Sequence, residues 1–135
     1  MKSADEIVSL MMKQDAFTKS LGIEIKAISE GYCQLSLKVK EEMTNGFGIA
    51  HGGISYCLAD STLAFASNSK GRKCVSIETS ISHLARVNVG DVLISNSKEI
   101  HFGNQIAVYE IEILTTENKR VAHFKGTVKV TEEFW

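Results

Sequence analysis

The chain has 135 residues, 44% of them hydrophobic, which is enough for one domain with a single core and too few for two. Its formal net charge is -1, and no run of like charges occurs, so nothing suggests a nucleic-acid or membrane-surface partner. The odd number of cysteines (Cys33, Cys57 and Cys74), without C-x-x-C spacing, argues against a disulfide framework or a zinc site.

The chain begins with a short amphipathic helix. Ser3 and Glu6 have the S-x-x-E spacing of a capping box, and apolar residues then repeat at helical spacing. We expect this helix to end near Gly22. Lysines and acids interrupt the apolar residues of 1–15, so this segment is neither a signal peptide nor a membrane span. We therefore expect a cytoplasmic protein in which residues 1–135 form one domain.

Alternation of apolar and polar residues predicts six strands. In the third strand, every second residue from Val75 to Ile81 is expected on one face and the polar residues between them on the other. The last strand alternates more regularly, with every second residue from Ala122 to Val130 on one side. The expected strands are 23–29, 32–40, 73–84, 92–102, 105–115 and 120–131.

A glycine-rich segment from Asn45 to Gly53 leads directly into a helix expected over Ile54–Ala66. The residues of this helix are apolar or small on every face, which is typical of a helix buried all round. Asp60 is the only charged residue in it. Burying an unpaired carboxylate is costly or shifts its pKa, so Asp60 needs a partner, a wet cavity or a chemical task. We interpret it as a catalytic candidate.

Antiparallel strands on either side of one apolar helix favour a single packing, in which a six-stranded sheet curls around that long central helix. The predicted fold class is therefore α+β, with the short helix at the N-terminus. No proline occurs in the chain, and no low-complexity tract marks a linker.

The motif Asn45-Gly46-x-Gly48-x-x-His51-Gly52-Gly53, with Asp60 seven residues later, resembles the hotdog-fold acyl-CoA thioesterases and especially their PaaI-like, phenylacetate-pathway branch. The order of elements matches as well, and the resemblance covers roughly residues 21–130. It implies hydrolysis of an acyl-CoA to the free acid and CoA. It also implies homodimers that assemble into homotetramers, without a cofactor, since coenzyme A is part of the substrate.

By position, Asp60 resembles the family's catalytic carboxylate, as nucleophile or general base. Gly53 or Gly52 resembles the amide that holds the oxyanion, a role for which the unpaired amides and positive dipole end of a helix N-terminus are suited. The other matched positions are the polar loop groups His51 and Asn45 and the polar assistant Ser76 on the third strand. After that strand the chain departs from the family, which often has an aromatic residue and a proline there; the segment 83–87 instead places Arg86, with His83, near where acyl-CoA phosphates run in relatives.

Each candidate also has a plainer interpretation. The glycines could simply permit close packing, Asp60 could pair with a basic residue, and His51 could bond only to backbone. Phe47 and Tyr56 would suit an aryl or medium-chain acyl tail, but ordinary core packing explains them at least as well. Cys57 is a formal rival nucleophile without an obvious base to lower its pKa.

Spacing along the helix adds a constraint that does not depend on the family resemblance. Gly53 and Asp60 are seven residues apart, so they share a helix face but lie about 10 Å apart along its axis. Attack and oxyanion stabilisation must both act within about 3 Å of one carbonyl group. If both residues are catalytic, they therefore act from different chains, as an isologous dimer with antiparallel helices would allow.

Two other functions remain open. A non-catalytic acyl-CoA-binding module would keep the fold without hydrolysis, although the intact Asp60 argues against it. An enoyl-CoA hydratase or dehydratase on the same fold would need its own acid and base pair in the helix and loop, and Asp60 is the one acid in the helix. His101 and His123 lack partners at metal-binding spacing, so no metal site is expected.

Overall fold

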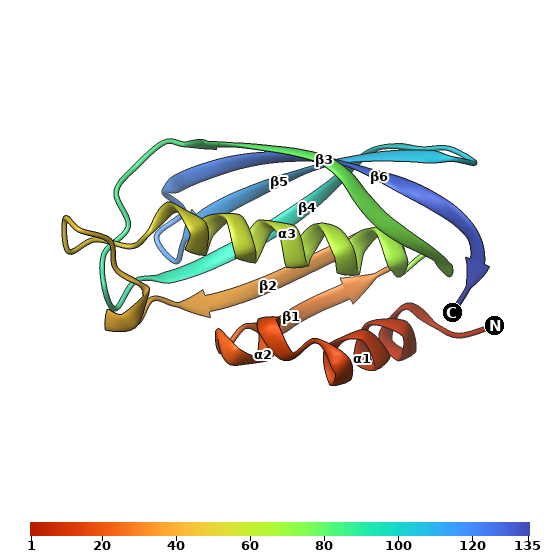
Figure 1. Ribbon diagram of the computed structural model, residues 1–135, viewed down its shortest axis with the longest axis horizontal. Coiled ribbons are helices and arrows are strands. Elements are labelled where there is room, and N and C mark those ends of the chain that lie inside the picture. The colour runs from red at the N-terminus through yellow and green to blue at the C-terminus, as the bar shows by residue number, and fades with distance from the viewer.

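Six antiparallel strands curl around one long helix in the computed structural model, which describes residues 1–135 (Figure 1). The sheet order is β1-β2-β4-β5-β6-β3, so β1 and β3 form its two edges. The predicted α+β architecture is confirmed. The strands are β1 (Glu24–Ser29), β2 (Tyr32–Lys38), β3 (Arg72–His83), β4 (Val92–Phe102), β5 (Ile106–Thr115) and β6 (Arg120–Phe134).

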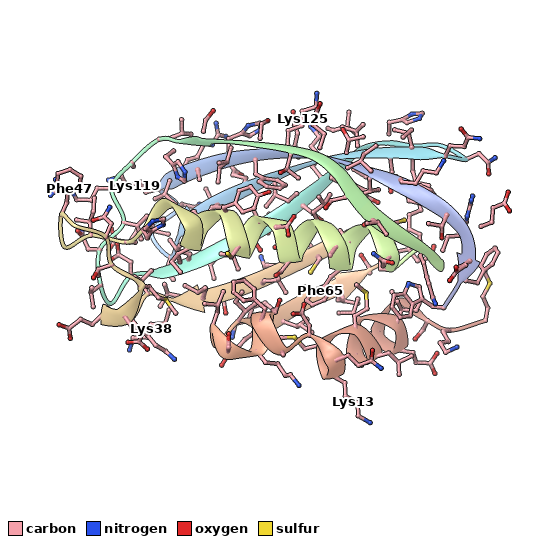
Figure 2. All side chains as sticks on the ribbon, in the orientation of Figure 1. Lys13, Lys38, Phe47, Phe65, Lys119 and Lys125 are labelled. Atoms are coloured by element: carbon pink, nitrogen blue, oxygen red, sulfur yellow. The ribbon has the colours of Figure 1, made fainter.

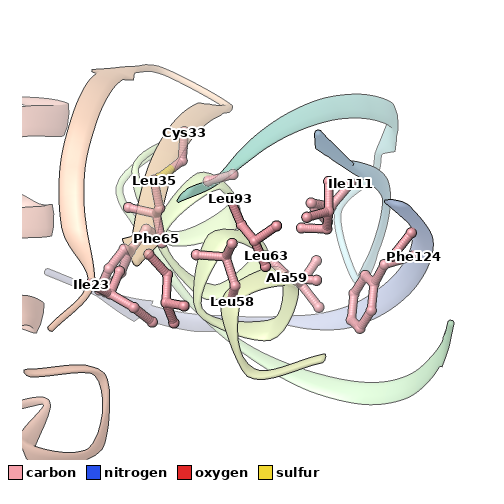
Figure 3. Close-up of a cluster of buried hydrophobic side chains, with 14 of the residues drawn as sticks. Ile23, Cys33, Leu35, Leu58, Ala59, Leu63, Phe65, Leu93, Ile111 and Phe124 are labelled. Carbon is pink, nitrogen blue, oxygen red and sulfur yellow. The ribbon is translucent and has the colours of Figure 1, made fainter. Parts of the chain in front are cut away.

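Helix α3 (Gly52–Asn68) lies across the concave face of the sheet and supplies the centre of the core (Figures 1 and 3). Its residues Leu58, Leu63 and Phe65 are almost completely buried. They belong to the same hydrophobic cluster as Leu93 of β4 and Phe124 of β6. Because burial of one large apolar side chain contributes about 1.5–3 kcal/mol, this packing holds α3 firmly against the sheet.

The sheet-facing side of α3 is buried, but the helix is not buried all round as predicted. Tyr56, Cys57, Asp60 and Ala64 are only half-buried and recur at spacings of three and four residues. They form one stripe, called here the open stripe of α3, that neither the sheet nor the N-terminal segment covers completely. The sequence suggested full burial because most members of this stripe are apolar or small.

The N-terminal segment contains two helices rather than the single one predicted. Helix α1 (Ala4–Gln14) has the expected capping box at Ser3 and Glu6, and α2 (Ala16–Ser20) follows after one residue. That residue is Asp15, whose φ of -82° and ψ of 81° are not helical and end α1. Helix α1 lies beside β1 (Figure 1). Both N-terminal helices also contact α3. No helix in the structure is long and apolar enough to span a membrane.

A β-bulge changes which residues of β3 face the helix. Ser76 pairs with Val128 and Glu78 pairs with Thr127, so Ile77 is an extra residue without a partner on β6. Val75 and Ile77 are 62% and 59% exposed, so the prediction that they share a buried face with the residues after them was wrong. The alternation of β6, by contrast, is confirmed, with its predicted inner residues buried.

Candidate active site

The first turn of α3 leaves one backbone donor free. His51 is the N-cap, and its Nδ1 accepts a hydrogen bond of 2.9 Å from the amide of Gly53. The neutral His51 ring therefore carries its proton on Nε2. The Gly52 amide donates to no group in the chain. As the first residue of a 17-residue helix, Gly52 holds this N–H at the positive end of the helix dipole.

The glycine-rich loop before α3 is held by its own polar groups. The Oδ1 of Asn45 accepts hydrogen bonds from the amides of Phe47 at 2.9 Å and Ile49 at 3.4 Å. The amide of His51 donates to the Met43 carbonyl at 2.8 Å. Asn45 therefore shapes the loop in this structure. Phe47 lies at the loop tip, 90% exposed and directed away from α3 (Figure 2).

A cavity of about 260 Å³ opens beside this helix start. Arg86 lines it, together with the imidazoles of His51 and His83. A Cβ atom at Gly52 would stand 3.0 Å from Nε2 of His83, so a residue without a side chain allows this close approach. We call this space the amide cavity; its lining is Ile49, Ala50, His51, Gly52, Ser55, His83, Ala85, Arg86 and Val87.

Asp60 lines a different and smaller cavity, of about 40 Å³, on the side of α3 that faces β3. Ser76 lines the same space, so the structure brings together these two residues predicted from the sequence. This is only possible because the bulge turns Ser76 toward the helix. We call it the carboxylate cavity; its lining is Asp60, Leu63, Ala64, Ser67, Cys74, Ser76 and Val128.

The environment of Asp60 makes its carboxylate more basic. No basic side chain lies within 4.0 Å of it. Burial raises the pKa of Asp60 above its ordinary value, and the nearby carboxylate of Asp15 raises it further. A carboxylate in a cavity, with a raised pKa and no ion-pair partner, is suited to accept a proton or attack a carbonyl carbon.

Within one chain, the two cavities have no lining residue in common. Gly52 and Asp60 are eight residues apart on α3, which corresponds to about 12 Å along the axis. One thioester group therefore cannot touch the Gly52 amide and the Asp60 carboxylate of the same chain. Within one chain the predicted site residues therefore form two groups, as their spacing along the helix required. The groups are Asn45, His51, Gly52, Gly53 and Arg86 at one end and Asp60 and Ser76 at the other.

Tyr56 and Cys57 lie between these ends, on the open stripe of α3. The Tyr56 ring packs edge-on against Phe124, with centroids 5.6 Å apart, and its hydroxyl is hydrogen-bonded to Thr79. Burial raises the pKa of the Cys57 thiol, and the charge of Asp60 raises it further. Cys57 is therefore a poor nucleophile at neutral pH. No group of three or more His, Cys, Asp or Glu side chains is placed to hold a metal ion.

Two residues beside Asp60 were missed from the sequence. Asp15 caps α2 by accepting a hydrogen bond from the Thr18 amide, and the Thr18 hydroxyl reaches Ser61 on α3. Asp15 and Thr18 have the D-x-x-T spacing of an N-terminal cap, which was available in the sequence. It was overlooked because the segment up to Gly22 was interpreted as one helix.

Comparison with known proteins gives consistent matches. The model of the "Thioesterase superfamily" matches residues 47–122. The chain is 38% identical over 116 residues to acyl-coenzyme A thioesterase PaaI of Escherichia coli, covering 86% of this chain and 83% of that protein. The structure of the E. coli PaaI protein from the phenylacetic acid degradation operon is similar with a TM-score of 0.94 at 34% identity, covering 97% of this chain and 95% of that one.

A hypothetical thioesterase of Streptococcus pneumoniae, solved with coenzyme A, is also similar. Its TM-score is 0.80 at 27% identity, with 84% of this chain and 91% of that chain covered. The same protein has been solved with an aspartate replaced by alanine and, separately, with a threonine replaced by alanine sixteen positions later.

Proposed function

This chain belongs to the thioesterase superfamily, and from that premise we propose that it hydrolyses acyl-CoA thioesters to the free acid and CoA. The observation that carries the proposal is the Asp60 carboxylate, which faces a cavity shared with Ser76 and has no ion-pair partner. The spacing of sixteen residues from Asp60 to Ser76 equals the spacing of the two replaced residues in the S. pneumoniae thioesterase.

In the proposed reaction, Asp60 either attacks the thioester carbonyl carbon or removes a proton from an attacking water. Negative charge then develops on the carbonyl oxygen, where the Gly52 amide donates a hydrogen bond supported by the dipole of α3. The Gly53 amide is bonded to His51, so we assign Gly52 as the main donor and Gly53 with His51 as its support. The C–S bond breaks and CoA leaves as the thiolate. When water attacks, the proton that Asp60 removed from it passes to the thiolate and the free acid forms directly; when Asp60 attacks, an acyl–Asp60 anhydride forms and water hydrolyses it, releasing the free acid, regenerating the carboxylate and supplying the proton of the thiol.

We propose that each site combines Asp60 of one subunit with Gly52 of its partner, because about 12 Å of helix separates them within a chain. Two surfaces support a two-fold interface. The open stripe of α3 carries apolar and small residues around Asp60. Edge strand β3 has a 12-residue length and exposes Val75 and Ile77, which makes it a template for pairing with another strand.

The substrate side of the proposal rests on the amide cavity. Arg86 at its rim supplies a positive charge for the coenzyme phosphates, and the CoA-bound relative makes a CoA ester the natural candidate. We infer an aryl or medium-chain acyl group, with Tyr56 on the open stripe as its contact. Phe47 would contact substrate only if the loop moved toward the cavity or if the substrate were bound by a partner subunit. A cytoplasmic homotetramer built from such dimers, without a resident cofactor, completes the proposal.

Asp60→Asn tests this function. The variant keeps the shape of the side chain but removes its basicity, so thiol release from a panel of acyl-CoAs should fall by about two orders of magnitude or more. Asp5→Asn, a charge loss at an exposed position of α1, is the matched control and should turn over normally. Near-normal turnover by Asp60→Asn would disprove the role of Asp60.

The same assay separates the remaining alternatives. Tight binding of acyl-CoA by the wild-type protein without thiol release would favour a binding module. Loss of the enoyl absorbance without thiol release would indicate a hydratase. Hydrolysis in ¹⁸O-labelled water under single-turnover conditions identifies direct attack if the product acid stays unlabelled, because its new oxygen then comes from Asp60 after water opens the anhydride at the Asp60 carbonyl. A labelled product is decided by trapping the anhydride, which forms only on direct attack.

A further inference from the structure

A short relay of hydrogen bonds joins the N-terminal segment to α3 directly beside Asp60. Asp15 accepts two bonds from Thr18, from its amide at 3.0 Å and from its hydroxyl at 2.7 Å. The Thr18 hydroxyl is in turn 2.8 Å from the Ser61 hydroxyl, with the proton donated by Ser61 because Thr18 already donates to Asp15. Thr18 is 1% exposed and Ser61 is 9% exposed.

The relay is more than is needed to cap α2. An aspartate N-cap requires only the bond from the Thr18 amide, which is the usual device at a helix start. The hydroxyl bonds extend this cap across the interface to the residue that follows Asp60 on α3. Buried polar pairs restrict orientation because misaligned partners would lose their hydrogen bonds. The relay therefore restrains the turn of α3 from which the Asp60 side chain extends.

We propose that the elbow between α1 and α2 is part of the catalytic apparatus. Thr18 fixes the position of the Asp60 turn through Ser61, and the bonds from Thr18 hold the Asp15 carboxylate next to that turn as its charged neighbour. This inference rests on the proposed function, because it concerns the same carboxylate. Asp15 and Thr18 lie outside residues 47–122, the part of the chain matched by the family model. Both are positioning residues, since they act through Ser61 and Asp60.

The titratable groups around Asp60 show which of them can change its pKa. From the elbow, Asp15 is the one acidic neighbour that raises the pKa of Asp60. On α3 itself the titratable neighbour is Cys57, and from β3 it is Cys74, and burial holds both thiols in their neutral form by raising their pKa values. No basic side chain forms an ion pair with Asp60. Asp15 is therefore the charged neighbour whose removal should move the titration of Asp60.

Two substitutions separate the charge of Asp15 from the restraint by Thr18. Asp15→Asn removes the charge and keeps an N-cap acceptor for the Thr18 amide, because asparagine caps helices as well as aspartate does. Its Nδ2 replaces the oxygen that accepts from the Thr18 hydroxyl, so that bond is kept in the reverse direction, with Nδ2 donating to Thr18 and Thr18 donating to Ser61. Thr18→Val keeps the charge and the shape but removes the hydroxyl, while Thr18→Ser restores a hydroxyl. Each full-length variant is assayed for kcat and KM across pH with the best acyl-CoA, with Asp5→Asn as the control for loss of a distant charge.

With Asp60 active as the ionised base, kcat/KM rises with pH through the pKa of Asp60 in the free enzyme. Asp15→Asn should move this acid limb to lower pH and leave the plateau nearly unchanged. Thr18→Val should lower kcat by about tenfold with little change in KM, since a small displacement of the base affects the chemical step. Thr18→Ser should recover most of the loss, and Asp5→Asn should match the wild type.

Several results would overturn the inference. If the acid limb of Asp15→Asn coincides with that of the wild type, Asp15 only caps α2. If Thr18→Val turns over normally, or Thr18→Ser is as slow as Thr18→Val, the hydroxyl does not position Asp60. Failure of the proposed function is distinguishable, because the wild type would then release no thiol. In that case, NMR titration of ¹³C-labelled aspartate carboxyls still shows whether Asp15→Asn lowers the pKa of Asp60.

Discussion

Mixing two inactive variants should restore activity if Asp60 and Gly52 meet across a subunit interface. Gly52→Pro deletes the free amide under favourable conditions, because proline is preferred at the first position of a helix. His51 before it already has φ of -62° and ψ of 137°, a conformation that a following proline allows. The amide bonds to nothing in the chain, so no internal hydrogen bond is lost.

Gly52→Ala is the matched control. Its Cβ would also meet Nε2 of His83 at 3.0 Å, but its amide would remain. Removal of one oxyanion donor typically lowers kcat by about 10²- to 10³-fold, so Gly52→Pro should be far slower than Gly52→Ala. Circular dichroism and thermal melting of both variants would show that the helix start is intact.

The complementation experiment combines Gly52→Pro with Asp60→Asn under conditions that let subunits exchange. In a mixed isologous dimer, one site receives both defects and the other receives neither. Random exchange of a 1:1 mixture makes about half of the dimers mixed, each with one working site of two, so activity should approach about one quarter of the wild type. Each variant alone should stay near about one hundredth or less.

Native mass spectrometry of isotope-labelled subunits would establish exchange independently. If mixed dimers form and activity stays at the level of the separate variants, Asp60 and Gly52 do not share a site across subunits. Recovery well above one quarter would contradict a strict one-intact-site dimer as well.

Two further predictions concern stability. Because the pKa of Asp60 is raised on folding, the folded state binds its proton more tightly than the unfolded state, and stability falls as pH rises through the window between the two pKa values. Asp60→Asn should therefore have a higher Tm than the wild type at pH 7, with the difference shrinking as the pH is lowered through that window, in differential scanning calorimetry; an equal Tm at pH 7 would contradict this. Gly126→Ala should destabilise the fold by about 1–3 kcal/mol in urea unfolding, because its Cβ would overlap Cδ2 of the buried Leu63. Gly46→Ala, with nothing within 4 Å of its Cβ, should cost much less.

Periodicity predicted most of the fold because the core depends on it. Every second residue of β6 from Ala122 to Val130 is on the inner face, as expected. The resemblance to hotdog thioesterases, drawn from the loop and Asp60, is confirmed by the family match and by the PaaI structure. The capping box at Ser3 also formed as predicted, since it depends only on local hydrogen bonds.

The failures have local physical causes. The break at Asp15 was missed because apolar residues continue at helical spacing on both sides, while the cap that ends α1 depends on backbone angles at a single residue. The faces of β3 were misassigned because a bulge reverses the alternation without any glycine or proline to mark it. The open stripe of α3 was expected to be buried because three of its four residues are apolar or small, and such residues look like core residues in a single sequence wherever they lie.

The bulge in β3 allows one strand to contribute a residue to each of the two cavities. Ser76 and His83 are seven residues apart, an odd number, so in a regular strand they would lie on opposite faces. The extra residue Ile77 shifts the alternation by one, so Ser76 and His83 lie on the same face of β3. The strand therefore contributes Ser76 to the carboxylate cavity and His83 to the amide cavity. A relative lacking one residue at this point could keep either contact in place but would lose the other. The number of residues between Ser76 and His83 is thus constrained by the contacts that both side chains make at the two cavities, even though Ile77 lines neither cavity.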